Sequence, residues 1–276
     1  MEVGSALRLK FWGVRGSTPT PEPSNLGFGG NTTCIEVRSR EGVIVIDAGT
    51  GVRGLGKCLN DEFIDTNLKL HFLLTHFHWD HIQGLPFFAP LYLPANEIVF
   101  HSARPPEQLR EILEGQMSSP YYPISFEYPA AKKTLVDIGC NPFRHFGVSV
   151  HPFPLHHLQG ATGYRIESEG KVITHASDLE HGHVRLDKIL REYAQDADVL
   201  IYDAQYTPEE YAARKGYGHS TWLEATRVAR DCNVERLILF HHDPNHDDET
   251  MSEILNEARH HFENTDVAKE GWGVVL

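Results

Sequence analysis

The stretch THFHWDH, residues 75–81, places three imidazoles and one carboxylate within six consecutive positions. It follows the apolar run LKLHFLL, residues 68–74, which is typical of a buried strand. In an extended segment, residues two apart point to the same side, so His76, His78 and Asp80 can converge on one point, and a turn at Asp80 would bring His81 to it. A lone histidine is ordinarily a hydrogen-bonded core or surface residue, whereas four such groups together indicate a bound divalent cation.

The number of clustered groups favours two ions over one. Four ligands are too many for one ion that also keeps an open catalytic position. His76 with His78 would therefore hold one ion and Asp80 with His81 the other, with about 3.5–4 Å between the metals, as in dinuclear hydrolases. Partners are expected at other strand ends, where the candidates are His156, His157, Asp178, His241 and His242. A carboxylate has two oxygens and can bridge two cations, although Asp178 could also cap a helix.

Short segments rich in β-branched and aromatic residues alternate with helical patterns along the whole chain. The predicted strands span residues 7–14, 32–38, 43–47, 68–75, 97–101, 148–153, 162–167, 171–175, 199–203 and 236–240. The predicted helices span residues 106–116, 183–193, 208–215, 221–231 and 249–264. No linker or repeat interrupts them. The pattern indicates one α/β domain with layered sheets and helices outside.

Composition limits the partners and the compartment. The 276 residues carry 25 basic and 38 acidic side chains, for a net charge of -13, so no general attraction to nucleic acid or to an anionic membrane is expected. The N-terminal MEVGSALRLKF lacks the apolar core of a signal peptide, and no apolar run approaches the roughly 20 residues of a membrane span. The four cysteines form no CxxC pair, which argues against a thiolate zinc site. We expect a soluble, cytoplasmic protein with reduced thiols.

The ordered set of motifs resembles the metallo-β-lactamase superfamily. Its phosphodiesterase branch, which includes tRNase Z and phosphoribosyl cyclic phosphodiesterases, is resembled by FWGVRGSTPTP, GGNTTCIEV, VIDAGTGVRGLG, THFHWDHIQGLPFF, GYRIESEGKVITHASD, GHSTW and LILFHHDP. The resemblance implies a four-layer αββα sandwich of two mixed β-sheets with helices outside. It also implies a single hydrolase domain over residues 1–276, with a substrate-side insert at about residues 104–146.

The same resemblance implies a ligand set for two divalent ions, with zinc preferred and manganese or iron as alternatives. One ion is assigned to His76, His78 and His157, the other to Asp80, His81 and His241, and both to Asp178. His157 lies six residues before Gly163, the usual interval, which leaves His156 a supporting role. His241 directly follows a predicted strand, with His242 as the alternative. Asp47 would orient metal-binding histidines, or else only stabilise a turn.

The resemblance also places groups around the substrate. Arg15 and Ser17, in a glycine-containing loop, and Asn31 with Thr32 are expected to hold a phosphate, although the loop glycines could serve only a tight turn. His219 in GHSTW is expected to reach the scissile phosphate, supported by Asp203, and is otherwise a residue before a helix. Asp203 stands where tRNase Z carries a glutamate, so the proton-transfer network can differ. His219, Asp203 and Asp80 form the predicted catalytic set.

The implied reaction is hydrolysis of a phosphodiester by a metal-bridging hydroxide, with His219 at the leaving oxygen. Residues 104–146 contain five basic and five acidic side chains, unlike the basic, glycine-rich arm by which tRNase Z grips its substrate. We therefore expect a small substrate, such as a cyclic nucleotide or another cyclic phosphodiester, and do not expect nucleic acid. The alternatives are a lactone, thioester or β-lactam hydrolase and a tRNA 3′-processing endonuclease. The aromatic residues of segment 119–128 could line the cleft or a homodimer interface.

Overall fold

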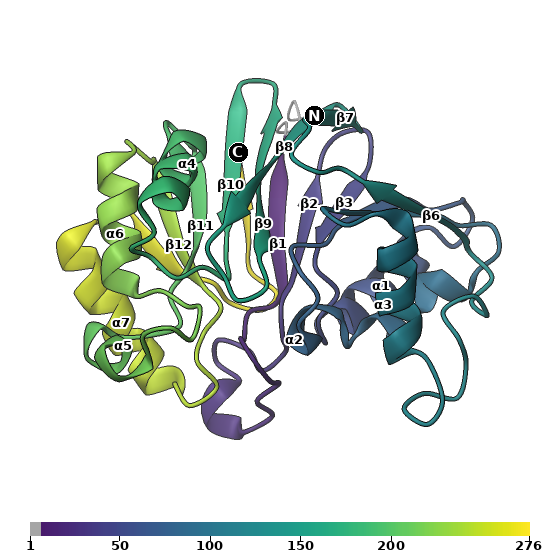
Figure 1. The fold of residues 1–276 in the computed structure, drawn as a ribbon, viewed down its shortest axis with the longest axis horizontal. Coiled ribbons are helices and arrows are strands. Elements are labelled where there is room, and N and C mark those ends of the chain that lie inside the picture. Colours follow the sequence, from purple (N-terminus) through teal and green to yellow (C-terminus); the bar gives the residue numbers. More distant parts are fainter. Residues whose placement is uncertain (1–6) are drawn as a thin grey trace.

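The protein is described by a computed structural model over residues 7–276, in which two seven-stranded sheets lie face to face (Figure 1). Residues 1–6 lie outside the described residues. They belong to the N-terminal segment MEVGSALRLKF, which was expected not to be a signal peptide. In spatial order, the first sheet consists of β14 (Gly273–Val275), β1 (Arg8–Gly13), β2 (Cys34–Arg38), β3 (Val43–Ile46), β4 (Lys69–Leu73), β5 (Glu97–Ser102) and β6 (Lys132–Asp137). The second sheet consists of β13 (Thr265–Val267), β12 (Arg236–Phe240), β11 (Val199–Asp203), β10 (Lys171–Ala176), β9 (Ala161–Ser168), β8 (Val148–Leu155) and β7 (Phe143–His145).

Helices cover the outer face of each sheet, which confirms the four-layer αββα sandwich (Figure 1). The first sheet is covered by α1 (Val52–Glu62) and α3 (Pro106–Gln116). The second sheet is covered by α4 (Val184–Ala194), α6 (Trp222–Asp231) and α7 (Asp248–His261). Two short helices, α2 (Trp79–Ile82) and α5 (Pro208–Arg214), lie in loops that follow strands.

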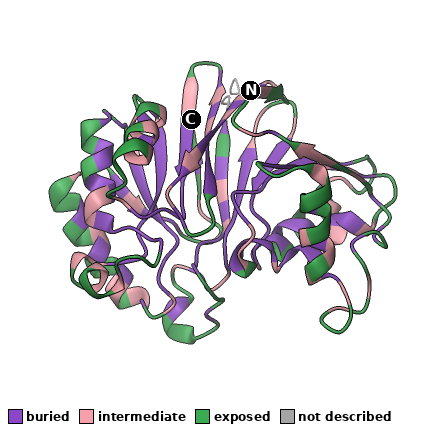
Figure 2. Cartoon of the chain, viewed as in Figure 1, coloured by how far each residue is buried: buried purple, intermediate pink, exposed green. Residues whose placement is uncertain are grey.

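The alternation of side chains along the strands produces three apolar layers. In β3, Ile44 and Ile46 pack between the two sheets, whereas Val43 and Val45 pack under the helices of the first sheet. All four residues are at most 2% exposed. Figure 2 shows the same division, with buried strands inside and exposed residues on the outer surfaces of the helices. Burial on both faces explains why these strands read as continuous apolar runs.

Parallel pairing brings the ends of several strands to one edge of the sandwich. Strands β3, β4, β5 and β6 pair in parallel, as do β10, β11, β12 and β13. In parallel strands the carboxyl ends lie at the same edge of a sheet, where ligand sites of α/β proteins usually form. The loops that follow β3, β4, β10, β11 and β12 carry most of the polar side chains singled out in the sequence.

The ten predicted strands and five predicted helices are present, with bounds shifted by up to about three residues. The sequence missed α1, α2, β6, β7, β13 and β14. Segment 104–146, predicted as an insert, forms α3, β6 and β7 and so carries the chain from the edge of the first sheet to the edge of the second. Within residues 7–276, no helix combines the length and the apolar composition needed to cross a membrane.

Candidate metal centre

The loop after β4 forms the centre of the site. The backbone stays extended as far as His78, which has φ -62° and ψ 150°, and α2 begins at the next residue. The extended part presents His76 and His78, while the helical turn carries Asp80 and His81 to the same place. The turn that the sequence required at Asp80 is therefore supplied by α2.

A first group of ligand atoms comes from His76, His78 and His157. The Nε2 atom of His157 lies 3.3 Å from Nδ1 of His78. The Nδ1–H group of His157 donates to the carbonyl of Gly218 at 2.7 Å, which leaves the lone pair of Nε2 facing the group. The Nε2 atom of His76 is buried and, among the described residues, has no hydrogen-bond partner. A buried ring nitrogen without a hydrogen-bond partner is suited to bind a metal ion.

A second group comes from Asp80, His81 and His241. The Nε2 atoms of His81 and His241 lie 3.4 and 3.3 Å from Oδ2 of Asp80. The Nδ1–H group of His81 donates to Asp47 at 2.7 Å, and that of His241 donates to Gln205 at 2.9 Å. Both hydrogen bonds orient the rings so that Nε2, the nitrogen that would bind an ion, faces Asp80.

Asp178 lies between the two groups. Its Oδ1 atom is 3.7 Å from Nε2 of His76 and 3.2 Å from Nε2 of His241, while its Oδ2 atom is 3.3 Å from Nε2 of His81. The carboxylate is 1% exposed. Asp178 therefore lies within 4 Å of ligand nitrogens of both groups. We call the set of His76, His78, Asp80, His81, His157, Asp178 and His241 the candidate metal centre.

Three residues of the site have a strained backbone. Asp47, Asp178 and His241 have φ values of 59°, 64° and 63°, in the left-handed region that non-glycine residues rarely adopt. Each lies within two residues of the end of its strand, β3, β10 or β12. The left-handed turn directs each side chain back over the strand ends. Strain of this kind costs roughly 1–3 kcal/mol per residue and collects at functional sites.

The ionisation of the ligands suits cation binding. Burial lowers the pKa values of His76, His78 and His157, so these rings are neutral at pH 7. Burial opposes ionisation of Asp80 and Asp178, but the adjacent histidines hold both pKa values below the usual range. Burial likewise opposes protonation of His241, but Asp178 and other carboxylates raise its pKa to about 9. A divalent cation would displace such protons and use the same carboxylates, so metal uptake should release protons.

His219 lies beside the candidate metal centre. Its ring centroid is 4.8 Å from that of His241 and 5.2 Å from that of His157. Its Nδ1–H group donates to Oδ2 of Asp203 at 2.9 Å, which leaves Nε2 as the free nitrogen. Asp203 is fully buried at the end of β11 and also accepts from the backbone N–H of Asp178 at 3.0 Å. One carboxylate therefore positions both His219 and the segment that carries Asp178.

The two alternative histidines point elsewhere. Nε2 of His242 donates to the carbonyl of Ala268 at 2.8 Å, on the far side of the strand from His241. His156 donates through Nδ1 to the carbonyl of Glu180 at 2.9 Å and packs against His183. Neither ring belongs to a group of ligand atoms in the described residues. The geometry therefore favours His241 and His157.

Arg15 does not have the place expected of a phosphate-binding residue. Its side chain is fully buried, and its guanidinium donates to the carbonyls of Gly29 at 2.8 Å and His246 at 2.6 Å. Two further bonds go to the carbonyls of Asp243 and Asn25, at 3.1 and 3.2 Å. The interpretation of Arg15 as a substrate contact is corrected here: it ties the loop after β1 to the loop after β12, and its donors are used within the protein.

Of the other predicted substrate residues, Asn31 and Thr32 are bonded inside the protein and Ser17 is exposed. The side chain of Asn31 donates to Glu270 at 3.0 Å, and the buried hydroxyl of Thr32 accepts from the backbone N–H of Thr50 at 2.8 Å. Both are engaged inside the protein. Ser17 is exposed, and its backbone N–H donates to Oδ2 of Asp80 at 2.7 Å. Of these three residues, Ser17 is the one whose side chain is free beside the site.

Sequence reasoning missed two supporting residues. Gln205 fixes the ring of His241, as described above. Glu180 accepts from the backbone N–H groups of Gly216 at 2.7 Å and Gly218 at 3.0 Å, and so braces the loop that carries His219. Neither residue belongs to a recognisable spacing, since each acts through a backbone position or through one ring nitrogen. Their roles became visible only from the fold.

The fold is a four-layer sandwich with a group of histidines and aspartates at one edge, and comparison with known proteins identifies the family. Residues 43–242 match the beta-lactamase superfamily domain. The chain belongs to this family, which confirms the superfamily inferred from the motifs. A curated relative, Ribonuclease Z of Bacillus thuringiensis (strain Al Hakam), is 38% identical over 102 residues. This match covers 37% of the present chain and 32% of the relative, so the aligned part spans about a third of the relative's length.

Solved structures show the same fold. The metallo-beta-lactamase fold protein YhfI from Bacillus subtilis superposes with a TM-score of 0.74 at 16% identity, covering 98% of this chain and 99% of YhfI. A diphosphatase from the PhnP family superposes with a TM-score of 0.72 at 17% identity, covering 98% of each chain. At such identities the likeness establishes the architecture, and the chemistry must be argued from the residues of this chain.

Proposed function

We propose that the protein is a dinuclear metal-dependent phosphodiesterase that acts on a small phosphodiester, with a cyclic nucleotide or another cyclic phosphodiester as the preferred class. The observation that carries the proposal is the convergence of five imidazoles and two carboxylates on one point, with the Nε2 atoms of His76 and His81 buried and unpartnered in the described part of the chain. Donors of this kind fit zinc, manganese or iron.

Two ions would be held by the candidate metal centre, one by each group of ligands and both by Asp178. When bound, they would supply Lewis-acid stabilisation of phosphoryl oxygens and a nucleophile at neutral pH. The protein's own contribution is to fix the rings: Gly218, Asp47 and Gln205 each accept from the nitrogen that does not face the site. Ligands held in this way need no rearrangement when an ion enters.

His219 is proposed to act on the leaving oxygen. Asp203 holds its Nδ1 proton, so Nε2 can carry a second proton and give it up to an alkoxide. The ring is 9% exposed and stacks on His241, so it is within reach of a substrate at the metals. The buried Asp203 would stabilise the imidazolium before the transfer.

A small substrate is supported by the charge of the chain and by the groups at the site. Residues 104–146 contain equal numbers of basic and acidic side chains, and the net charge is -13. The ring of Trp79, between two proposed ligands, is 77% exposed and free to stack on a base. These features suit one nucleotide better than a long polyanion.

RNA is the second candidate substrate, because the curated relative of 38% identity is named Ribonuclease Z. A polynucleotide needs several phosphate contacts from basic side chains. Arg15, which the sequence offered as a phosphate contact, is fully buried and engaged with carbonyls. A third candidate, hydrolysis of a lactone, thioester or β-lactam, would use the same metals, but the segment GHSTW that carries His219 resembles the phosphodiesterase branch.

The test is a hydrolysis panel with metal-loaded protein. Cyclic nucleotides, linear phosphodiesters, lactones and a precursor tRNA would be compared for wild type, Asp178→Ala and His156→Ala. We expect about two ions at the candidate metal centre of each wild-type chain, with these ions and phosphodiesterase activity lost in Asp178→Ala and both largely kept in His156→Ala. Equal metal content in the two variants, or turnover of lactones alone, would refute the proposal.

A further inference from the structure

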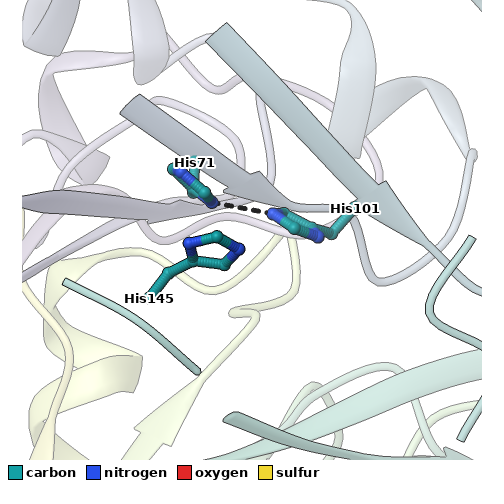
Figure 3. Close-up of side chains that lie close together, drawn as sticks. All are labelled: His71, His101 and His145. Carbon is teal, nitrogen blue, oxygen red and sulfur yellow. Dashed lines mark hydrogen bonds between the residues drawn. The ribbon is translucent and has the colours of Figure 1, made fainter. Parts of the chain in front are cut away.

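A second histidine cluster lies outside the candidate metal centre. His71 of β4, His101 of β5 and His145 of β7 turn their rings toward one point (Figure 3). One ring nitrogen from each lies within 4.8 Å of the others. The Nδ1 atom of His71 is 2.8 Å from Nε2 of His101, and the ring centroids of His71 and His145 are 4.3 Å apart. We call these three residues the edge cluster.

The register of the sheet explains why the edge cluster forms. His101 pairs with Leu73, two residues after His71, so His71 and His101 lie on the same face of the first sheet. That face is opposed to the second sheet, as the packing of Leu73 in the core between the sheets shows. His145 is the last residue of β7 before the turn of the β7–β8 hairpin, where it pairs with Val148. The hairpin thus presents His145 to the first sheet.

The edge cluster is unusual because two of its three histidines are buried. His71 and His101 are 7% and 2% exposed, and the Nδ1 atom of His101 has no hydrogen-bond partner in the described residues. No carboxylate is among the ligand groups there. Phe143 stacks on His101 with a centroid distance of 4.6 Å, and Phe146 contacts His71 at 4.7 Å. What calls for an explanation is the pair of buried imidazole nitrogens that face each other, Nδ1 of His71 and Nε2 of His101, with no carboxylate beside them.

We propose that the edge cluster is a third metal site, which binds one divalent transition-metal ion of the kind that prefers imidazole, such as Zn²⁺. Tetrahedral coordination with bonds of about 2.0–2.1 Å places ligand nitrogens roughly 3.4 Å apart. The His71 and His101 nitrogens need only separate slightly to reach that spacing. An all-nitrogen site without carboxylates selects zinc, nickel or copper and discriminates against Mg²⁺ and Ca²⁺.

Exposure of His145 gives the site an entrance and an open position. His145 is exposed at the surface, so an ion can reach the buried pair from solvent, and water can complete the coordination. Bound there, the ion would connect two strands of the first sheet to the edge hairpin of the second. Because the site exists only in the folded chain, its occupation should stabilise the protein.

The test is a Zn²⁺ titration of the full-length protein with bound metal counted by mass spectrometry of the inorganic elements. His145→Ala removes an exposed ligand and should leave the fold intact. We expect this variant to bind one Zn²⁺ fewer per chain than wild type and to lose the corresponding thermal stabilisation. Removal of a residue that only hydrogen-bonds to a metal ligand lowers metal affinity by about 10–100-fold. Loss of the ligand His145 itself should lower the Zn²⁺ affinity of the edge cluster at least as much. His151→Ala, on the neighbouring strand β8, is the matched control and should bind as wild type.

The edge cluster can be tested separately from the candidate metal centre. In the Asp178→Ala background, which should empty the centre, the edge cluster should still take up one Zn²⁺, and adding His145→Ala should abolish that uptake. Zn²⁺ uptake by the edge cluster can therefore be measured even if the candidate metal centre binds no ion. The proposal is overturned if wild type and His145→Ala bind equal amounts of Zn²⁺. It is also overturned if Mg²⁺ in equal concentration replaces Zn²⁺ at the edge cluster.

Discussion

At the scale of single residues, Asp203 connects the parts of the site. Its Oδ2 atom accepts from His219 and from the backbone N–H of Asp178, and its Oδ1 atom accepts from the backbone N–H groups of Ser220 and Gln205 at 3.1 and 3.2 Å. With the backbone N–H of Leu179, which donates to Oδ2 at 3.4 Å, five donors hold this fully buried carboxylate in one position. The resemblance to tRNase Z would place a glutamate here. The shorter Asp203 still reaches and orients His219.

The first prediction concerns His219→Ala. If His219 protonates the leaving oxygen, the variant should keep its metals but lose roughly 10²–10⁴ in kcat on a phosphodiester with a poor alkoxide leaving group. With a nitrophenolate leaving group the loss should be much smaller, because that oxygen scarcely needs a proton. Steady-state kinetics on both substrates, with metal analysis of the same sample, measure this.

Asp203→Asn is the companion variant for the His219 prediction. It keeps the shape of the side chain but removes the negative charge that stabilises an imidazolium, so it should show the same dependence on leaving group with a smaller loss. Equal losses on both substrates for His219→Ala would assign the residue to phosphate positioning. Loss of metal would place His219 among the ligands.

At the scale of elements, Arg15 joins two loops through four backbone carbonyls. Arg15→Met keeps most of the volume but leaves these buried acceptors unpaired. We expect the free energy of unfolding to fall by at least about 2 kcal/mol, since each unsatisfied buried group costs about 1–3 kcal/mol. KM for a small phosphodiester should be little changed below the melting transition. A raised KM with unchanged unfolding in denaturant would restore Arg15 as a substrate contact.

His175 of β10 gives a prediction for pH. Burial lowers its pKa to about 4, and the residue is 1% exposed. Between pH 6.5 and about 4 the unfolded chain binds a proton that the folded chain excludes, so stability falls as the pH is lowered through this window. In metal-free protein, His175→Leu should reduce that slope by up to about 1.4 kcal/mol per pH unit. Denaturant unfolding of both proteins at several pH values measures the difference, and parallel slopes would refute the assignment.

The elements that the sequence predicted and those that it missed differ in physical terms. The buried strands β11 and β12 were found with their bounds because both faces are apolar. Helix α1 was missed because Gly54 and Gly56 interrupt its pattern, although Gly56 lies against Phe88, where a side chain would clash. The edge strands β6 and β7 lack a continuous apolar face, and β13 and β14 are three residues long.

The residues of the candidate metal centre could be proposed from the sequence because they fall at strand ends in a recognisable order. The groups that support them could not. The role of Arg15 depends on a loop more than 200 positions away in the chain. That of Gln205 depends on one hydrogen bond to a ring nitrogen, and that of Glu180 on bonds from two backbone N–H groups. The edge cluster escaped the sequence analysis because His71, His101 and His145 come from three strands without any spacing that links them.

At the scale of the whole molecule, net charge should govern the choice between substrates. With 38 acidic and 25 basic side chains, the surface repels a long polyanion. We predict that kcat/KM on a small cyclic phosphodiester exceeds that on precursor tRNA and depends only weakly on salt. Efficient tRNA cleavage that falls steeply with rising salt would show several phosphate contacts and make RNA the substrate.

The central claim, that seven residues form a dinuclear metal centre, is tested most directly by anomalous diffraction from crystals of the zinc-loaded protein. We predict two peaks about 3.5–4 Å apart at the carboxyl ends of the strands, with Asp178 in contact with both. One peak should lie beside His76, His78 and His157 and the other beside Asp80, His81 and His241. A single peak at this site, or two peaks that Asp178 does not bridge, would contradict the account.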